Sequence, residues 1–417
     1  MNRGHFTAFD DVAITEAVRT PWIDLNGELA QVSPIDLGIK VARAVLRRAG
    51  IEPGEVDSVL AGSMAQASFD AYLLPRHIGL YSGVAQDVPA LSVQRICGTG
   101  LELLRQAGDQ LRNGVQLALC VGTESMSRNP IVAYDHRGGF RLGAPVGFKD
   151  FLWEALYDPA PGVDMIATAD RLARDYGISR QQADDYALAS HQRAVRARNS
   201  GWLADEIVAI DNEVFELDGY GCRGIRLPRR TGPVEQDSHP RPDTDLAALA
   251  GLSAIHAGGV QTAGNSCAVV DGAAAALVGH ASACKGPVLA HLLAASVIGV
   301  APEIMGIGPA PAVRLLLERC GLALDDIGLL EINEAQSAQV LAVSRALELE
   351  PQRFNQRGGS IALGHPLAAT GVRLVLTLAR QLREGNLQYG IATACIGGGQ
   401  GMALLIENPD YRKRGAN

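Results

Sequence analysis

The chain has 417 residues, 47% hydrophobic and 20% charged, the composition of a globular protein long enough for two or three structural units. Its formal net charge of −8 argues against nucleic acid or an anionic membrane as a partner. Seven cysteines without CxxC or Cys/His ligand spacing predict reduced thiols and no metal site; no signal-peptide core opens the chain, so a cytoplasmic location is expected.

Strands and helices alternate along most of the chain. In the first part we expect a helix at about 35–49, a strand at about 56–61, a helix at about 98–112 and a strand at 116–121. In the last part we expect a helix at 310–320, a strand at 327–332, a helix at 369–384, a strand at 390–396 and a final stretch at 397–407. This alternation predicts α/β layers with a sheet in each half.

The two parts are copies of one another. RAGI at 48–51 recurs as RCGL at 319–322, 271 positions later. Thr99-Gly100 recurs as Thr370-Gly371, and LRNG at 111–114 as LREG at 382–385, both in the same register. Three matches at one offset indicate tandem halves.

An insertion interrupts the first copy. The counterpart of the final stretch, DGAAAALVG, comes only at 271–279, after a segment at about 126–264 of different texture. That segment predicts two amphipathic helices, at about 167–176 and from 179, and a Pro/Arg-rich stretch at 227–242. We expect a helical and loop-rich cap over the paired core.

Cys97 lies where the second predicted helix begins. The helix dipole and unpaired N–H groups at that position favour a thiolate. Taken alone, such a cysteine is more often core filler than a nucleophile.

Three turns of the second half carry polar side chains next to strands or helices. Asn333 follows a strand, His365 stands between Gly364 and Pro366 before a helix, and Cys395 precedes three glycines. Each also has a structural interpretation, as a helix cap, a loop histidine or a buried thiol. The GGGQG run is not a phosphate loop, since only 16 residues follow Gly401.

Together these residues fit acyl transfer. A thiolate attacks thioesters readily, and a histidine can take and return its proton. Backbone N–H groups beside glycines can form an oxyanion hole, and a second thiolate can act as a base on carbon.

The chain resembles the thiolase family over nearly its full length. The segments that carry the resemblance are RICGTGLELL, GTESMSRNP (122–130), TAGNSCAVVDGAAA (262–275), MGIGPAPA (305–312), NEA, GGSIALGHPLAATG (358–371) and CIGGGQG. The resemblance implies an α/β fold with two tandem βαβαββ halves and an inserted loop domain. The implied units are 1–125 plus about 265–282 for the first half, 126–264 for the inserted domain that binds coenzyme A, and 283–417 for the second half.

The resemblance also implies the role of each catalytic residue. Cys97 becomes acylated, His365 activates it, Asn333 and His365 form one oxyanion hole through a water, and Cys395 moves the α-proton. The backbone N–H groups of Cys97 and Gly397 form the other oxyanion hole.

Further residues are implied to bind substrate: Arg241, Met165, Ser266, Cys267 and Met305. Departures from the family pattern occur at Asp164 to Ile166 in place of His-Met-Gly, and at Gln336, Cys267 and Ala368. They leave the acyl preference open.

The implied activity is reversible acetyl transfer on coenzyme A thioesters, in fatty acid metabolism. Coenzyme A thioester would be substrate rather than prosthetic group, and the enzyme a homodimer or homotetramer. Two alternatives stay open at this point. One is a decarboxylating ketosynthase-type enzyme, against which Cys395 speaks, and the other is a non-catalytic acyl-CoA-binding subunit.

Overall fold

A computed structural model describes residues 3–65, 71–134, 136–227, 232–284 and 286–412. The first half contains β1 (His5–Ala8), β2 (Val12–Arg19), β3 (Ile23–Asp24), α1 (Pro34–Ala49), β4 (Ser58–Gly62), α2 (Leu74–Tyr81), β5 (Ala90–Ser92), α3 (Thr99–Leu111), β6 (Leu117–Glu124) and, after the insertion, β13 (Val270–His280). The second half contains β14 (Ala290–Gly299), α8 (Pro309–Cys320), β15 (Ile327–Ile332), α9 (Ser337–Leu347), α10 (Ser360–Leu363), α11 (Leu367–Gly385), β16 (Tyr389–Ile396) and β17 (Gln400–Glu407).

The two halves repeat one pattern of strand pairing. In the first half the order is β2-β13-β6-β4, with the last pair parallel and the others antiparallel. In the second half β14-β17-β16-β15 has the same order and the same directions. A short β14–β2 pairing joins both into one eleven-stranded sheet. The predicted α/β fold of two tandem halves is confirmed, although the two sheets are continuous.

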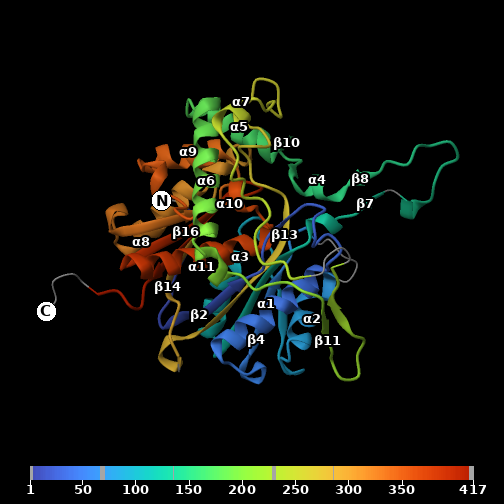
Figure 1. Cartoon of the computed structure of the whole chain (residues 1–417), viewed down its shortest axis with the longest axis vertical. Helices are drawn as coiled ribbons and strands as arrows, with labels where there is room; N and C mark the ends of the chain where they lie inside the picture. The colour runs from blue at the N-terminus through green and yellow to red at the C-terminus, as the bar shows by residue number, and fades with distance from the viewer. Residues whose placement is uncertain (1–2, 66–70, 135, 228–231, 285, 413–417) are drawn as a thin grey trace.

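The strands carry side chains into different cores on their two faces. Alternate residues of β13 point to opposite faces, as the two-residue period of a strand requires. One set, Ala274, Ala276 and Val278, packs in the core that contains residues of α3 and α11. The other set, Ala273, Ala275 and Leu277, packs in the core that contains residues of α1 and α2. The helices α3 and α11 lie near the middle of the molecule (Figure 1), and most of their residues are buried.

The glycines of the repeat mark where α3 and α11 touch. A Cβ on Gly371 would lie 2.2 Å from the backbone N of Leu101, and a Cβ on Gly100 would lie 2.7 Å from the N of Gly371. No side chain fits at such distances, so only glycine permits this close approach of two backbones. The repeated Thr-Gly pair is thus explained by the contact between the halves.

The insertion forms helices over the core and one projecting arm. Its elements are β7 (Ile131–Val132), β8 (Lys149–Asp150), α4 (Phe151–Ala155), β9 (Tyr157–Asp158), β10 (Val163–Asp164), α5 (Met165–Asp175), α6 (Arg180–Asn199), β11 (Glu213–Phe215), β12 (Arg223–Ile225) and α7 (Leu246–Ala250). Figure 1 shows the arm with β7 and β8 extending away from the body. Within the Pro/Arg-rich stretch, residues 228–231 lie outside the described residues.

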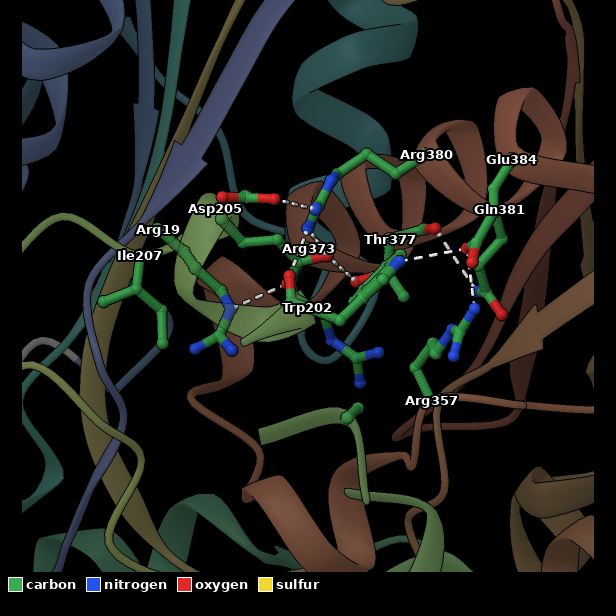
Figure 2. Close-up of polar contacts among 12 residues, drawn as sticks. Arg19, Trp202, Asp205, Ile207, Arg357, Arg373, Thr377, Arg380, Gln381 and Glu384 are labelled. Carbon is green, nitrogen blue, oxygen red and sulfur yellow. Dashed lines mark hydrogen bonds and ion pairs between the residues drawn. The ribbon is translucent and has the colours of Figure 1, made fainter. Parts of the chain in front are cut away.

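Buried ion pairs and hydrogen bonds connect the insertion to both halves. Arg19 on β2 contacts Glu206 and Asp237 of the insertion at 3.1 and 2.7 Å, with all three side chains buried. Glu206 also accepts from Thr377 of α11 at 2.8 Å. Figure 2 shows the neighbouring contacts of α11, where Arg380 reaches Asp205 and stacks over Trp202.

Most predicted elements are found within a few residues of their expected bounds, including the helices of the insertion at 165–175 and 180–199. The sequence did not predict β2, β14, α2 or α9. In the part of the chain that the structure describes, no helix combines the length and apolarity needed to cross a membrane.

Candidate active site

Cys97 sits in a strained turn at the start of α3. Ile96 has φ = 46°, in the left-handed region that β-branched residues rarely adopt. The turn is held by Gly98 N–H, which donates to the Arg95 carbonyl at 2.8 Å. The Thr99 hydroxyl donates to the Ile96 carbonyl at 2.7 Å. A rare conformation held this firmly is typical of a functional site.

Burial dominates the chemistry of the Cys97 thiol. Burial raises its pKa to about 11, although N–H groups of Gly397 and of Cys97 itself bond to the sulfur and oppose the rise. The thiolate expected from the helix position is therefore not the resting form of the free enzyme. The helix dipole is a local effect, whereas the loss of solvent depends on everything packed around the sulfur.

His365 is buried and neutral, between α10 and α11. Burial, followed by the charge of Arg373, lowers its pKa to about 3. Thr370 Oγ1 donates to the Pro366 carbonyl at 3.1 Å and so accepts from Nδ1 of His365 at 2.6 Å. This arrangement keeps the proton on Nδ1 and leaves the lone pair on Nε2.

Asn333 faces that lone pair. Its Nδ2 lies 3.2 Å from Nε2 of His365, and its Oδ1 accepts from the Ser360 hydroxyl at 2.8 Å. The backbone N–H of Asn333 donates to Thr393 on β16 at 2.9 Å, which continues the pairing of β15 with β16. The amide group is therefore fixed at both ends.

Cys395 lies fully buried near the end of β16. It packs in a small apolar cluster with Met305 and Ala335, and Met165 lies against this cluster. Burial, followed by the neighbouring Cys97 and Cys267, raises the pKa of Cys395 well above its usual range.

Gly397 links the two cysteines. It follows Cys395 by two residues, and its N–H bonds to the sulfur of Cys97. A Cβ on Gly397 would lie 3.4 Å from the side chain of Ile96 and 3.6 Å from the sulfur of Met165. The turn after β16 therefore touches both the nucleophile segment and the beginning of α5.

The nucleophile segment also meets the histidine segment. Leu367, two residues after His365, packs in one apolar cluster with Cys97, Met64 and Met126. The backbone N–H of His365 donates to Ala268 at 3.0 Å, next to Cys267. The four residues predicted to be catalytic thus come from both halves to one buried region.

The residues predicted to bind substrate fall into two groups. Met165, Met305 and Cys267 adjoin the cysteines, and Ser266 forms an antiparallel bridge with Gln336 beside them. Arg241 is exposed, and its backbone N–H donates to Nδ1 of His191 at 3.3 Å. The structure does not bring Arg241 to the cysteines, so its contact with coenzyme A stays a prediction.

Asp164 has a structural role of its own. Its carboxylate caps α5 by accepting from Ala167 N–H at 2.8 Å. It also pairs with His256 at 3.0 Å. Asp164 and His256 therefore form an acid–histidine pair at the start of α5.

Two buried glutamates that support the site were missed by the sequence analysis. Glu124 accepts from Ser63, Met64, Ala65 and Ala368, and burial raises its pKa to about 7. Glu334 accepts from Tyr186 and Ser190 of α6, from Asn355 and from Ile361 N–H. Their positions inside the ESMS and NEA motifs were the only available signal. Within the described ranges, no group of three or more His, Cys, Asp or Glu residues could hold a metal ion.

Fold and site together define a two-half α/β protein with one buried cysteine from each half in a shared centre. Two family models match it, the thiolase N-terminal domain over residues 12–282 and the thiolase C-terminal domain over residues 286–408. The chain belongs to the thiolase family.

Relatives are similar over nearly their whole length. The mitochondrial 3-ketoacyl-CoA thiolase of Bos taurus is 38% identical over 95% of this chain and 98% of its own. The probable acetyl-CoA acetyltransferase of Escherichia coli K12 is 38% identical over 96% of this chain and 100% of its own. The structure of human mitochondrial 3-ketoacyl-CoA thiolase in complex with CoA is 37% identical, covers 95% of this chain and 98% of its own, and has a TM-score of 0.88.

Proposed function

We propose that this thiolase transfers acetyl groups between coenzyme A thioesters, either by cleaving 3-ketoacyl-CoA with coenzyme A or by condensing two acetyl-CoA molecules. The names of the bovine and Escherichia coli relatives support both directions, and detailed balance makes both available to one site. The observation that carries the proposal is the meeting of Cys97 and Cys395 beside the His365–Asn333 pair. Neither a decarboxylating ketosynthase nor a non-catalytic subunit is favoured by these relatives.

In the cleavage direction, Nε2 of His365 takes the thiol proton of Cys97 as the sulfur attacks C3 of the 3-ketoacyl chain. The imidazole is neutral with its proton on Nδ1, so Nε2 carries the lone pair that accepts the proton. N–H groups of Cys97 and Gly397 lie at the sulfur and stabilise one developing oxyanion. The amide of Asn333, through a water that it holds, and the Nε2–H that His365 gains in this step stabilise the other.

The C2–C3 bond then breaks, and its electron pair passes to C2 of the departing acetyl-CoA. The thiol of Cys395 protonates that carbon, and its thiolate next takes the proton of incoming coenzyme A. The coenzyme sulfur attacks the acyl group on Cys97, the shortened acyl-CoA leaves, and His365 returns its proton to the released sulfur of Cys97. The reaction ends with both cysteines as thiols and no prosthetic group used.

Thiolysis of acetoacetyl-CoA by the purified protein tests the proposal. We expect two acetyl-CoA for each acetoacetyl-CoA and coenzyme A consumed, and no turnover by the Cys97→Ala variant. Absence of product from a folded wild-type protein would overturn the proposal.

The inserted domain is proposed to hold the coenzyme, and the enzyme to be a homodimer or homotetramer. Two exposed surfaces are of the kind that contacts a second copy of the chain. Strand β5 ends the sheet, no strand among the described residues pairs with its outer edge, and Leu91 is exposed. The arm around β7 and β8 exposes Phe140, Leu142 and Phe148. A cytoplasmic location stays a prediction, and the bovine and human relatives are mitochondrial by name.

A further inference from the structure

In the described part of the chain, three polar side chains beside the cysteines have buried atoms without a protein partner. Among the described residues, no hydrogen-bond partner contacts Oγ of Ser266, Oε1 of Gln336 or Nε2 of Gln339. Gln336 and Gln339 are at most 5% exposed. Leaving such atoms unpaired costs free energy, so they call for an explanation. We call these three residues the polar trio.

The geometry of the chain brings the trio together. Ser266 and Gln336 stand opposite one another in an antiparallel bridge. The flanking bonds run from Cys267 N–H to the Ala335 carbonyl and from Ser337 N–H to the Asn265 carbonyl. In such a pair the two side chains lie on the same face at close spacing. Gln339 lies three residues after Gln336 at the start of α9.

The trio adjoins the apolar cluster of Cys395. Ala335, which precedes Gln336, packs with Cys395 and Met305. The N–H of Ala335 donates to Oε1 of Gln339 at 3.1 Å, which leaves Nε2 as the unused group. A Cβ on Gly306, next to Met305, would lie 2.8 Å from Cγ of Gln339. An acyl chain that extended from the reaction centre past this cluster would therefore meet the trio.

The hydrogen-bonding capacity of the trio is mixed and uncharged. Gln336 offers an acceptor, Gln339 offers a donor, and the Ser266 hydroxyl can do either. A group that both donates and accepts would satisfy all three, whereas an alkyl chain would satisfy none. A carboxylate would bring a charge that no member of the trio can neutralise.

We propose that Ser266, Gln336 and Gln339 select 3-ketoacyl-CoA substrates whose acyl chain carries an uncharged group that both donates and accepts hydrogen bonds, such as an amide or a hydroxyl. This inference rests on the proposed function and names its substrate class. A site built around hydrogen bonds rejects an analogue that lacks them, because its buried groups are then left unpaired.

Three substrates of matched shape test the proposal: 6-amino-3,6-dioxohexanoyl-CoA, 3-oxoadipyl-CoA and 6-methyl-3-oxoheptanoyl-CoA, which end in an amide, a carboxylate and an isopropyl group. We expect wild-type kcat/KM for thiolysis to be about tenfold or more higher for the amide than for either analogue. Equal values, or a preference for another member, would overturn the proposal without any variant.

Variants then assign the preference to the trio. Gln336→Leu and the smaller change Ser266→Ala are expected to lower the ratio of amide to isopropyl turnover, the first by about tenfold. Gln352→Leu makes the same replacement at an exposed position of the Pro351–Arg353 turn and should leave the ratio unchanged. Equal losses on all three substrates would overturn the proposal, because the trio would then contact the coenzyme part that they share.

Acetoacetyl-CoA distinguishes failure of the proposed substrate class from failure of the proposed thiolase activity. It has no polar terminal group, and the wild-type protein should cleave it. Cleavage of acetoacetyl-CoA with no preference for the amide contradicts only the substrate class. No cleavage of any substrate contradicts the proposed function itself.

Discussion

Nδ2 of Asn333 lies 3.2 Å from Nε2 of His365, which joins the end of β15 to the turn before α11. Each side chain is fixed by a second hydrogen bond. The Ser360 hydroxyl donates to the amide oxygen of Asn333, and Nδ1 of His365 donates to the Thr370 hydroxyl. Two side chains held in this way are preorganised to bind a developing oxyanion.

Removing either side chain is expected to abolish most turnover. Asn333→Ala and His365→Ala should each lower kcat for thiolysis on the order of 100- to 1000-fold, the usual cost of one oxyanion-hole group. Near-normal kcat in either folded variant would contradict the assignment.

The support of His365 by Thr370 can be tested separately. Thr370→Val removes the acceptor for Nδ1–H, so the imidazole loses its fixed tautomer and kcat should fall, whereas Thr370→Ser keeps the hydroxyl and should retain most activity. Valine is nearly isosteric with threonine and serine lacks only its methyl group, so the two variants separate the loss of the hydroxyl from a change of packing. Equal activity of both would remove Thr370 from the positioning of His365.

Acylation should map to Cys97. Brief incubation with acetyl-CoA, followed by digestion and mass measurement, is expected to find one acetyl group on the peptide that contains Cys97. Cys120 is the reference, since it is fully buried on β6 and its thiol contacts the Leu103 carbonyl. A reproducible label on Cys120 or Cys320 would refute the role of Cys97.

Alkylation of Cys97 should depend steeply on pH. Because burial raises the pKa of Cys97 to about 11, the thiolate fraction grows about tenfold for each pH unit below that value. Iodoacetamide should therefore modify Cys97 about 100 times faster at pH 9 than at pH 7. The exposed Cys222 serves as the accessibility reference. An alkylation rate that is already maximal at pH 7 would mean that Cys97 is a thiolate at neutral pH, as expected from the helix dipole.

The sequence could predict the halves because the repeat is local and in register. It could also place Cys97, Asn333, His365 and Cys395 at the ends of strands and helices. It could not predict β2 and β14, since their apolar runs have no period that separates a buried strand from a buried helix.

What surrounds the four residues depends on contacts between distant segments. Glu334, for instance, binds side chains of α6 that are more than 140 positions away in sequence. The shift in the pKa of Cys97 is opposite to the one expected from the sequence for the same reason. Its helix position is local, but its burial is a property of the whole fold.

The crossing of α3 and α11 yields a prediction on stability. Gly371→Ala would force a Cβ to 2.2 Å from the Leu101 backbone, so we expect the free energy of unfolding to fall by about 1–3 kcal/mol. Gly54→Ala, where a Cβ meets nothing within 4 Å, should change it by about 0.5 kcal/mol or less. Denaturant unfolding measures both. If the Gly371→Ala protein is as stable as the Gly54→Ala protein, α3 and α11 can move apart to accommodate the added methyl group at little cost in free energy.

The last prediction distinguishes the two cysteines. Acylation needs a nucleophile and its base, which Cys97 and His365 supply. Making or breaking the carbon–carbon bond also needs a group that moves the α-proton, the role assigned to Cys395. Serine has nearly the shape of cysteine, but its hydroxyl is far less acidic than a thiol. Cys395→Ser should therefore still accept an acetyl group on Cys97, while thiolysis and condensation are almost entirely lost.

Solvent deuterium uptake into the methyl group of acetyl-CoA reports the proton transfer alone, and the acyl-enzyme mass reports the nucleophile alone. We expect Cys395→Ser to keep the acyl-enzyme mass and to lose the deuterium uptake, because the fully buried thiol is the group beside Met305 and Ala335 that can exchange the proton. Cys267→Ser is the matched control, since Cys267 lies close enough to both cysteines to interact with them electrostatically but has no assigned proton transfer. If Cys395→Ser takes up deuterium at the wild-type rate and Cys267→Ser does not, the base is Cys267, and Cys395 only packs the end of β16.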